Sequence, residues 1–205
     1  MKVAVVSWNS PEFAPLAAIS EPGKREYCNR HGYEFAHRVE PFKDGWQRYE
    51  LIIEMLNAGY EMVLSLDADA MVMNHTLKVE RLYVEGKCFH VADDIWGLND
   101  GVMAVVGTPI AKQVLACAVG LGRHPAQKNH DTQQMIRAFI DNDPYKQYIY
   151  KERPAEFNAY KQSLYGRPDW FIGTYYPGAW ILQFPGLPNE VRLPLMKDAL
   201  AEVIR

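Results

Sequence analysis

The chain contains 205 residues, of which 48% are hydrophobic and 23% are charged, and its formal net charge is −3. This length suffices for one domain with a substantial core. The slightly acidic net charge gives no electrostatic basis for nucleic-acid binding by the chain as a whole, although a local basic groove is compatible with it. No stretch approaches the roughly 18 apolar residues that a membrane-spanning helix requires, so we expect no membrane span.

Strand and helix patterns alternate from the start of the chain, which predicts an α/β domain. The apolar run at residues 2–7 is too short for a secretion signal and is interpreted as the first strand. A helix is then predicted to begin near Pro22, with Ser20 near its N-cap, and to end at Gly32 as a left-handed residue. A second strand follows at residues 35–39.

The next helix leads to the strand that bears most directly on function. From Trp46 onward, apolar residues recur at the i, i+3, i+4 and i+7 spacing of one helix face, and Gly59 ends the pattern. The apolar run Met62–Leu66 then predicts a buried strand. Its carboxyl end is followed directly by Asp67 and Asp69.

The alternation of strands and helices continues through the rest of the chain. The remaining predicted elements, in chain order, are strands at residues 88–92 and 101–106, helices from Pro109 and from Asp131, a strand at 180–184 and a helix at 195–203. Thr108 is predicted to cap the helix from Pro109. Residues 141–177 are rich in Tyr, Pro and Gly and predict loops and short strands around a substrate cleft.

The carboxylates of Asp67 and Asp69 predict a metal site. The carboxyl ends of strands are where open α/β sheets bind ligands. Two hard oxygen donors at this spacing suit Mn²⁺ or Mg²⁺, which retain waters and share a substrate's phosphate oxygens. A cation there would stabilise a diphosphate as it leaves. A solvated, Asp-rich turn is the alternative interpretation.

The sequence around this pair resembles a known enzyme family. The resemblance rests on Y-C-N-R-H-G-Y-E-F at Tyr27–Phe35, W-Q-R at Trp46–Arg48 and G-Y-E-M-V-L-S-L-D-A-D-A-M-V-M-N at Gly59–Asn74, and on shorter segments at Asn99–Met103, His130–Gln134 and Gln183–Gly186. It is similar to the GT-A glycosyltransferases of the galactosyl, xylosyl and mannosyl type, the galactomannan and xyloglucan family. This implies one GT-A domain over residues 1–205, a Rossmann-like mixed sheet flanked by helices.

The resemblance also implies a set of site residues. Asp69 would be the more direct metal ligand, and Asp67 would bind both metal and the nucleotide ribose. Asn99 and Asp100 match a segment that lines the donor sugar, although Asn, Asp and Gly also favour a simple turn.

The resemblance implies donor contacts at three further positions. Asp131 matches a residue beside the reacting sugar, although it could equally cap its helix, and Gln133 is the next candidate for hydroxyl recognition. Arg48 occupies the position of a basic residue near the diphosphate, although it could equally be a solvated helix charge. Asp131 and Asp100 are the candidates for a role in catalysis.

Gln183 is the position where the chain departs from the pattern. The resembled family has a histidine there as a third metal ligand, in the sequence H-F-x-G, whereas this chain has Gln183-Phe184-Pro185-Gly186. A Gln oxygen can ligate a hard cation, but more weakly than imidazole or carboxylate. Gln183 is therefore expected as the third protein ligand of a weaker metal site.

The resulting functional hypothesis is a metal-dependent transfer of sugar from a UDP- or GDP-sugar donor to a hydroxyl acceptor, such as a glycan or a hydroxylated nucleobase in DNA. The resembled family retains the anomeric configuration, which implies same-face displacement without an enzyme nucleophile. A phosphatase of the haloacid dehalogenase type is disfavoured, because its D-x-D lies on the first strand. A non-catalytic nucleotide-sugar or glycan binding protein on the same fold remains the alternative.

The cysteines bear on the compartment. Cys28, Cys88 and Cys117 are odd in number and widely spaced, which favours buried, reduced thiols over disulfides or a metal cluster. Eukaryotic members of the resembled family usually carry a membrane anchor, so the sequence is expected to be a cytoplasmic catalytic domain of microbial or viral type.

Overall fold

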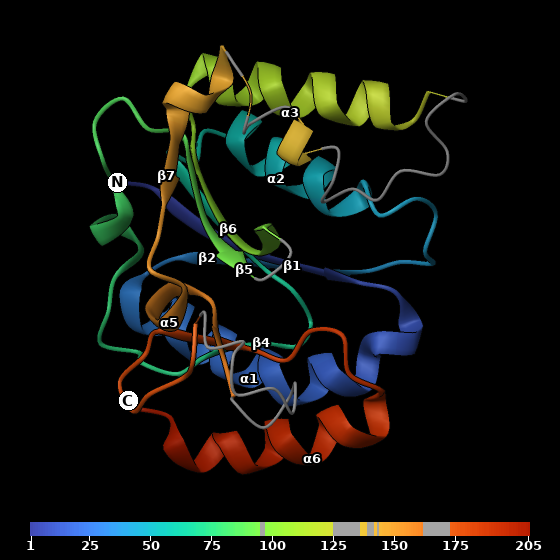
Figure 1. Cartoon of the computed structure of the whole chain (residues 1–205), viewed down its shortest axis with the longest axis vertical. Helices are drawn as coiled ribbons and strands as arrows, with labels where there is room; N and C mark the ends of the chain where they lie inside the picture. Colours follow the sequence, from blue (N-terminus) through green and yellow to red (C-terminus); the bar gives the residue numbers. More distant parts are fainter. Residues whose placement is uncertain (95–96, 125–135, 139–141, 143, 162–172) are drawn as a thin grey trace.

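A computed structural model describes residues 1–94, 97–124, 136–138, 142, 144–161 and 173–205. Its centre is a mixed six-stranded sheet in the order β2-β1-β3-β6-β5-β7 (Figure 1). The strands are β1 (Val3–Asn9), β2 (Glu34–Val39), β3 (Met62–Leu66), β5 (Phe89–Asp94), β6 (Gly97–Val106) and β7 (Ile149–Lys151). β1 pairs in parallel with β2 and β3, whereas β6 is antiparallel to both of its neighbours. The predicted mixed α/β sheet is confirmed.

A second, three-stranded sheet follows the Asp67–Asp69 turn and has the order β4-β9-β8. Its strands are β4 (Ala70–Val72), β8 (Ala159–Tyr160) and β9 (Ile181–Gln183). The antiparallel register of β4 and β9 sets Gln183 opposite Ala70. A residue far away in sequence is thereby brought directly beside Asp69.

Helices cover both faces of the central sheet (Figure 1). The α-helices are α1 (Ala14–His31), α2 (Gln47–Asn57), α3 (Pro109–Gly122), α5 (Pro154–Phe157) and α6 (Asn189–Ala199). Short 3₁₀ segments are η1 (Pro11–Phe13), η2 (Val79–Leu82), η4 (Tyr145–Tyr148) and η6 (Leu200–Glu202). In Figure 1, α2 and α3 lie on one side of the sheet and α1 and α6 on the other.

Alternating side chains of the strands build the two cores. In β1, Ala4 and Val6 pack in the cluster that contains the apolar faces of α2 and α3. Val3 and Val5 point the other way and pack in the cluster that contains Tyr27 of α1. This is the period-two alternation of a strand buried on both faces.

The first helix begins earlier than the sequence predicts. α1 begins at Ala14 and contains Pro22 in its interior, so the prediction of a start near Pro22 with a Ser20 cap is wrong. Pro15 already occupies the first turn, where a missing N–H costs nothing. The Ser20 hydroxyl instead donates to the Ala68 carbonyl at 2.6 Å. Gly32 ends the helix in the left-handed conformation as expected, with φ 72°.

Two further boundaries differ from the prediction. α6 begins at Asn189 rather than Leu195 and tolerates Pro194 in its interior, because Met196 and Ala199 are buried against the fold. β6 begins at Gly97 and includes Asn99 and Asp100, so the simple-turn alternative for that pair is wrong. A register shift between β5 and β6 occurs at this point, after Val91.

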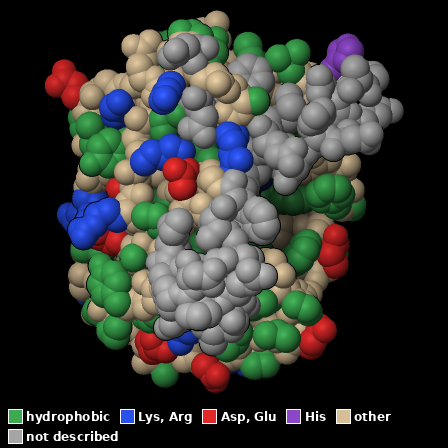
Figure 2. All heavy atoms as spheres, in the orientation of Figure 1, with side chains coloured by type: hydrophobic (Ala, Val, Ile, Leu, Met, Phe, Trp, Pro, Cys, Tyr) green, Lys and Arg blue, Asp and Glu red, His purple; other side chains and the backbone are tan. Residues whose placement is uncertain are grey.

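Several other predicted features agree with the structure and one cysteine differs, whereas the start of the helix predicted from Asp131 lies outside the described residues. α2, β3 and the Thr108 cap of α3 lie where predicted, and the Thr108 hydroxyl accepts from the Ala111 amide at 3.2 Å. Cys28 and Cys88 are buried free thiols, but Cys117 is exposed, against expectation. Among the described residues, no helix has both the length and the apolar character needed to cross a membrane. Acidic and basic side chains are interspersed on the face drawn in Figure 2.

Candidate functional site

A cavity of about 310 Å³ opens where β1 and β3 end. One part of its wall is aromatic and comes from Trp8, near the end of β1, and from Phe13, at the end of η1. The other part is charged and includes Asp67, Asp69 and Arg48. The cavity therefore lies at the carboxyl edge of the parallel strands, the edge that the sequence predicts for ligand binding.

The turn that carries the two carboxylates is held by main-chain and side-chain hydrogen bonds. The Asp67 amide donates to the Gly101 carbonyl of β6 at 2.9 Å, and the Ala70 amide donates to the Asp67 carbonyl at 3.0 Å. From α1, the Lys24 ammonium donates to the same Asp67 carbonyl at 2.7 Å. The turn is thus fixed to the sheet on one side and to α1 on the other, so the carboxylates are presented in a defined position.

Both carboxylates are surrounded by protein. Asp69 is 5% exposed and Asp67 is partly exposed toward the cavity. Burial raises the pKa of Asp67, and the charges of Asp69 and Asp100 add to this, whereas Arg48 opposes it. Burial also raises the pKa of Asp69, against the lowering effects of Arg192 and of the hydrogen bond from Gln183. Close carboxylates with raised pKa values favour binding of a positive group.

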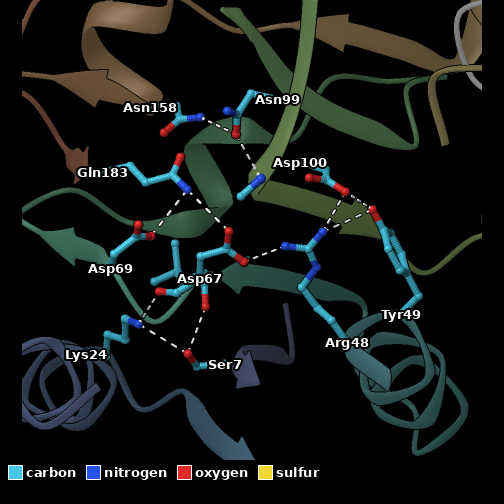
Figure 3. Close-up of polar contacts among 12 residues, drawn as sticks. Ser7, Lys24, Arg48, Tyr49, Asp67, Asp69, Asn99, Asp100, Asn158 and Gln183 are labelled. Carbon is cyan, nitrogen blue, oxygen red and sulfur yellow. Dashed lines mark hydrogen bonds and ion pairs between the residues drawn. The ribbon is translucent and has the colours of Figure 1, made fainter. Parts of the chain in front are cut away.

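Gln183 lies between the two carboxylates (Figure 3). Its Nε2 donates to Asp67 Oδ2 at 3.3 Å and to Asp69 Oδ1 at 3.4 Å. Its Oε1 is buried and has no partner among the described residues. Gly101 makes this approach possible, because a Cβ on Gly101 would lie 2.0 Å from Gln183 Nε2 and 2.8 Å from Asp67 Oδ2.

Arg48 joins Asp67 to a third carboxylate, that of Asp100 (Figure 3). Its guanidinium forms ion pairs with Asp67 and, at 2.6 Å, with Asp100 Oδ2, and the Tyr49 hydroxyl also donates to Asp100. Burial lowers the pKa of Arg48, but the two carboxylates outweigh this and raise it. Arg48 is 8% exposed. The alternative of a solvated helix charge is therefore wrong.

Asn99 belongs to a hydrogen-bonded network behind the cavity wall (Figure 3). Its Oδ1 accepts from the Gly101 amide at 2.9 Å and from Asn158 Nδ2 at 3.0 Å. Its Nδ2 donates to Asp94 at 2.9 Å. Neither Asn99 nor Asp100 is among the residues that line the cavity. Two other predicted residues, Asp131 and Gln133, lie outside the described residues.

Two cations at this site were not identified from the sequence. Lys24 is 1% exposed, and burial lowers its pKa to about 8 although Asp67 and Asp69 act in the opposite direction. Arg192 of α6 forms a 2.9 Å ion pair with Asp69. For Lys24 the sequence contains one signal, its four-residue spacing from Ser20 on α1. This spacing sets both side chains on the helix face toward the Asp turn. Nothing local in the sequence points to Arg192.

The donors present fit a hard divalent cation if other oxygens complete its coordination. The described residues contain no group of three or more His, Cys, Asp or Glu side chains that could hold a metal. Asp67 and Asp69 offer two carboxylates, and the Gln183 amide, whose Nε2 faces them here, would add its oxygen, which has no partner in the described part of the chain, once the amide is turned over. Mn²⁺ and Mg²⁺ accept such a set because they retain waters and bind phosphate oxygens.

Comparison with known proteins finds one family model, which matches the N-terminal part of the chain. Residues 7–87 match the model of the galactosyl transferase GMA12/MNN10 family. This segment includes Arg48, Asp67 and Asp69. No protein in the set of curated proteins matches the chain.

Several solved structures share the fold at low sequence identity. A glycosyltransferase involved in the glycosylation of the major capsid of PBCV-1 has 18% identity and a TM-score of 0.77, with 97% of this chain and 100% of that chain covered. The galactosyltransferase LgtC, solved with donor and acceptor sugar analogues, has 9% identity and a TM-score of 0.63, with 98% and 96% covered.

Mouse xyloside xylosyltransferase 1 has 10% identity and a TM-score of 0.51, with 91% of this chain and 98% of that chain covered. These likenesses show a common fold, and the matched segment carries the family's sequence pattern across the Asp turn. Residues 7–87 carry the sequence pattern of the galactosyl transferase GMA12/MNN10 family, and the chain has the fold of GT-A glycosyltransferases.

Proposed function

We propose that the chain transfers a sugar from UDP-sugar or GDP-sugar to a hydroxyl acceptor and that a divalent cation, Mn²⁺ or Mg²⁺, assists the reaction. The observation that carries the proposal is the meeting of Asp67 and Asp69, from the turn after β3, with Gln183 of β9 at the charged part of the cavity wall. The family match and the fold support the reaction class. The cation and the donor are our proposal.

Asp67, Asp69 and the Gln183 oxygen would hold the cation. When bound, the cation would neutralise the charge that develops on the diphosphate leaving group. Arg48 would keep the Asp67 carboxylate in position, because its guanidinium is fixed on the opposite side by Asp100 and Tyr49. Asp100 would thus act through Arg48, which revises the expected direct role in catalysis to a positioning role.

The aromatic part of the cavity wall suits the nucleoside half of the donor. Trp8 and Phe13 flank the cavity at the end of β1, and Trp8 lies 6.4 Å from Phe42 between ring centroids. Planar bases pack favourably on aromatic side chains. A donor placed with its base at these rings would extend its diphosphate toward Asp67 and Asp69.

The proposal also covers the reacting sugar and the acceptor. Asp131 and Gln133 remain proposed contacts to the reacting sugar, as does Asn99 through its network with Asn158. We retain same-face displacement with retention of configuration, and a glycan or a hydroxylated nucleobase in DNA as the acceptor class. The buried free thiols of Cys28 and Cys88 support a reducing compartment such as the cytoplasm.

Nucleotide release tests the proposal. A panel of UDP- and GDP-sugars is incubated with the protein in Mn²⁺ or EDTA, and the free UDP or GDP is measured with and without sugar acceptors. The wild type should release nucleotide in Mn²⁺. Asp69→Asn should abolish release because it removes the charge that the cation requires, and Asp67→Asn should reduce it less completely.

Asp198→Asn is the matched control, because it makes the same change at an exposed position of α6. It should release nucleotide as the wild type does. A folded Asp69→Asn protein with full release would contradict the metal assignment. A protein that binds these donors but releases no nucleotide with any acceptor would favour the non-catalytic alternative.

A further inference from the structure

Arg192 contacts Asp69 from the first turn of α6. Its Nη1 lies 2.9 Å from Asp69 Oδ2, and its Nε donates to the Leu187 carbonyl at 3.1 Å. The side chain is 12% exposed and lines the cavity together with Asp69. A cation that belongs to the protein therefore already neutralises the carboxylate that is proposed to hold the metal.

The charges at the site balance without any ligand. Three carboxylates lie here, on Asp67, Asp69 and Asp100, and the described cations that contact this turn or these carboxylates are Lys24, Arg48 and Arg192. A divalent cation alone would add two positive charges to this neutral cluster, and a diphosphate alone would add negative charge. Because charges are costly in poorly solvated surroundings, the cluster favours the two ligands together over either one alone.

Arg192 is the cation best placed to move. Lys24 is fully enclosed and fixed by Ser7 and the Asp67 carbonyl. Arg48 is fixed by two carboxylates and by the Tyr49 hydroxyl. Arg192 has one carboxylate partner within the described ranges, and it lines the cavity, which Lys24 does not.

We propose that Arg192 competes with the divalent cation for Asp69, and that it releases Asp69 and turns to the diphosphate when cation and nucleotide bind together. This inference rests on the proposed function, since it concerns the same cation and donor. Its consequence is positive coupling: Arg192 opposes binding of the metal alone and favours binding of the nucleotide with the metal. A purely structural role for the ion pair predicts no such opposition.

The test has two titrations. In the first, Mn²⁺ alone is added to the protein and the free ion is measured by electron paramagnetic resonance. In the second, the binding of UDP and GDP in Mn²⁺ is measured by calorimetry. In Arg192→Gln, the competing charge is lost, so Mn²⁺ alone should bind more tightly, by about fivefold or more. The nucleotide in Mn²⁺ should bind more weakly, also by about fivefold or more. The two affinities thus change in opposite directions.

Two further variants make the result specific. Lys197→Gln makes the same charge change at an exposed position of α6 and should alter neither affinity. Arg192→Lys retains the charge, so it should bind Mn²⁺ alone as weakly as the wild type does. If Arg192→Gln fails to fold, Arg192→Lys still tests the proposal. Tighter binding of Mn²⁺ alone by folded Arg192→Lys than by the wild type would contradict competition between Arg192 and the cation.

The two proposals fail in different ways. Unchanged or weaker binding of Mn²⁺ alone by folded Arg192→Gln, with metal-linked nucleotide binding intact in the wild type, would overturn this inference and leave the proposed function standing. Absence of any manganese-dependent binding of UDP or GDP by the wild type would overturn the proposed function, and this inference with it.

Discussion

Gln183 stands where the resemblance leads us to expect a histidine ligand, and we propose that it keeps the position of that ligand with a different donor atom. The register of β4 and β9 sets it beside Asp69, and its amide reaches both carboxylates. Its buried oxygen has no partner within the described part of the chain. An unsatisfied buried acceptor is costly, and with the amide turned over, coordination of a cation at the Asp pair would satisfy this oxygen. We therefore treat Gln183 as a weak ligand rather than as a lost one.

Gln183→His should tighten Mn²⁺ binding in the presence of UDP, because imidazole is a stronger ligand than an amide oxygen. We expect a gain of order tenfold, about 1.4 kcal/mol, measured by calorimetric titration of Mn²⁺. Gln113→His, at an exposed position of α3, controls for the added histidine. Equal affinities of Gln183→His and wild type would mean that this position lies outside the coordination sphere.

Some residues of the site can be predicted from the sequence around them, and others cannot. Asp67 and Asp69 can be predicted because two carboxylates directly follow an apolar strand, and Arg48 can be predicted from the resemblance. Arg192 reaches Asp69 only because α6 packs against the turn, which no short-range pattern reveals. Buried ion pairs between distant residues depend on tertiary structure, so sequence patterns do not record them.

The boundaries of helices and strands are likewise set in part by tertiary contacts that sequence patterns do not record. α2 and β3 could be placed because their hydrophobic periods are clear. The start of α1 was misplaced because Pro22 and Ser20 imitate a helix start, whereas tertiary contacts let the helix continue through the proline. β6 was predicted too short, because Asn99 and Asp100 have low strand propensity but are held by side-chain hydrogen bonds from neighbouring elements.

Gly101 of β6 packs directly against the side chains of Gln183 and Asp67. Gly101→Ala should displace Gln183 and Asp67, whose side-chain atoms lie within 2.0 and 2.8 Å of the new Cβ. We expect loss of manganese-dependent UDP binding at a stability cost of about 1 to 3 kcal/mol, measured by calorimetry and urea unfolding.

The matched control is Gly120→Ala, on the exposed side of α3 with open space around it. It should leave UDP binding unchanged and raise helix stability by up to about 1 kcal/mol. Wild-type UDP binding by Gly101→Ala would show that the close packing of Gln183 and Asp67 is not required.

Arg48 joins α2 to β3 and β6 through its two carboxylate partners. Arg48→Met would leave the buried Asp100 and the partly exposed Asp67 without their cation, so the free energy of unfolding should fall by roughly 3 to 5 kcal/mol, measured by urea denaturation. Arg38→Met breaks a more exposed pair with Glu54 and should cost no more than about 1 kcal/mol. Similar losses in the two variants would argue against Arg48 as the link between these elements.

At the scale of the whole molecule, the arrangement of the sheets explains why the site lies where it does. The parallel strands β1 and β3 end side by side and supply the aromatic and the acidic parts of one cavity. The second sheet then carries Gln183, and α6 carries Arg192, to the same edge. The α/β class and the edge of ligand binding could be predicted from the alternation of elements, but the second sheet could not, because its strands are only two or three residues long.

The most direct test of the account is a calorimetric titration of UDP and GDP into the wild-type protein in Mn²⁺ and in EDTA, with Asp69→Asn as the comparison. We predict that one of the two nucleotides binds much more tightly in Mn²⁺, and that at about 100 times its Kd it raises the free energy of unfolding by about 2.7 kcal/mol. Asp69→Asn should abolish the difference between Mn²⁺ and EDTA. Equal affinities of the wild type in Mn²⁺ and EDTA, or no binding of either nucleotide, would contradict the assignment of Asp67 and Asp69 to a metal and diphosphate site.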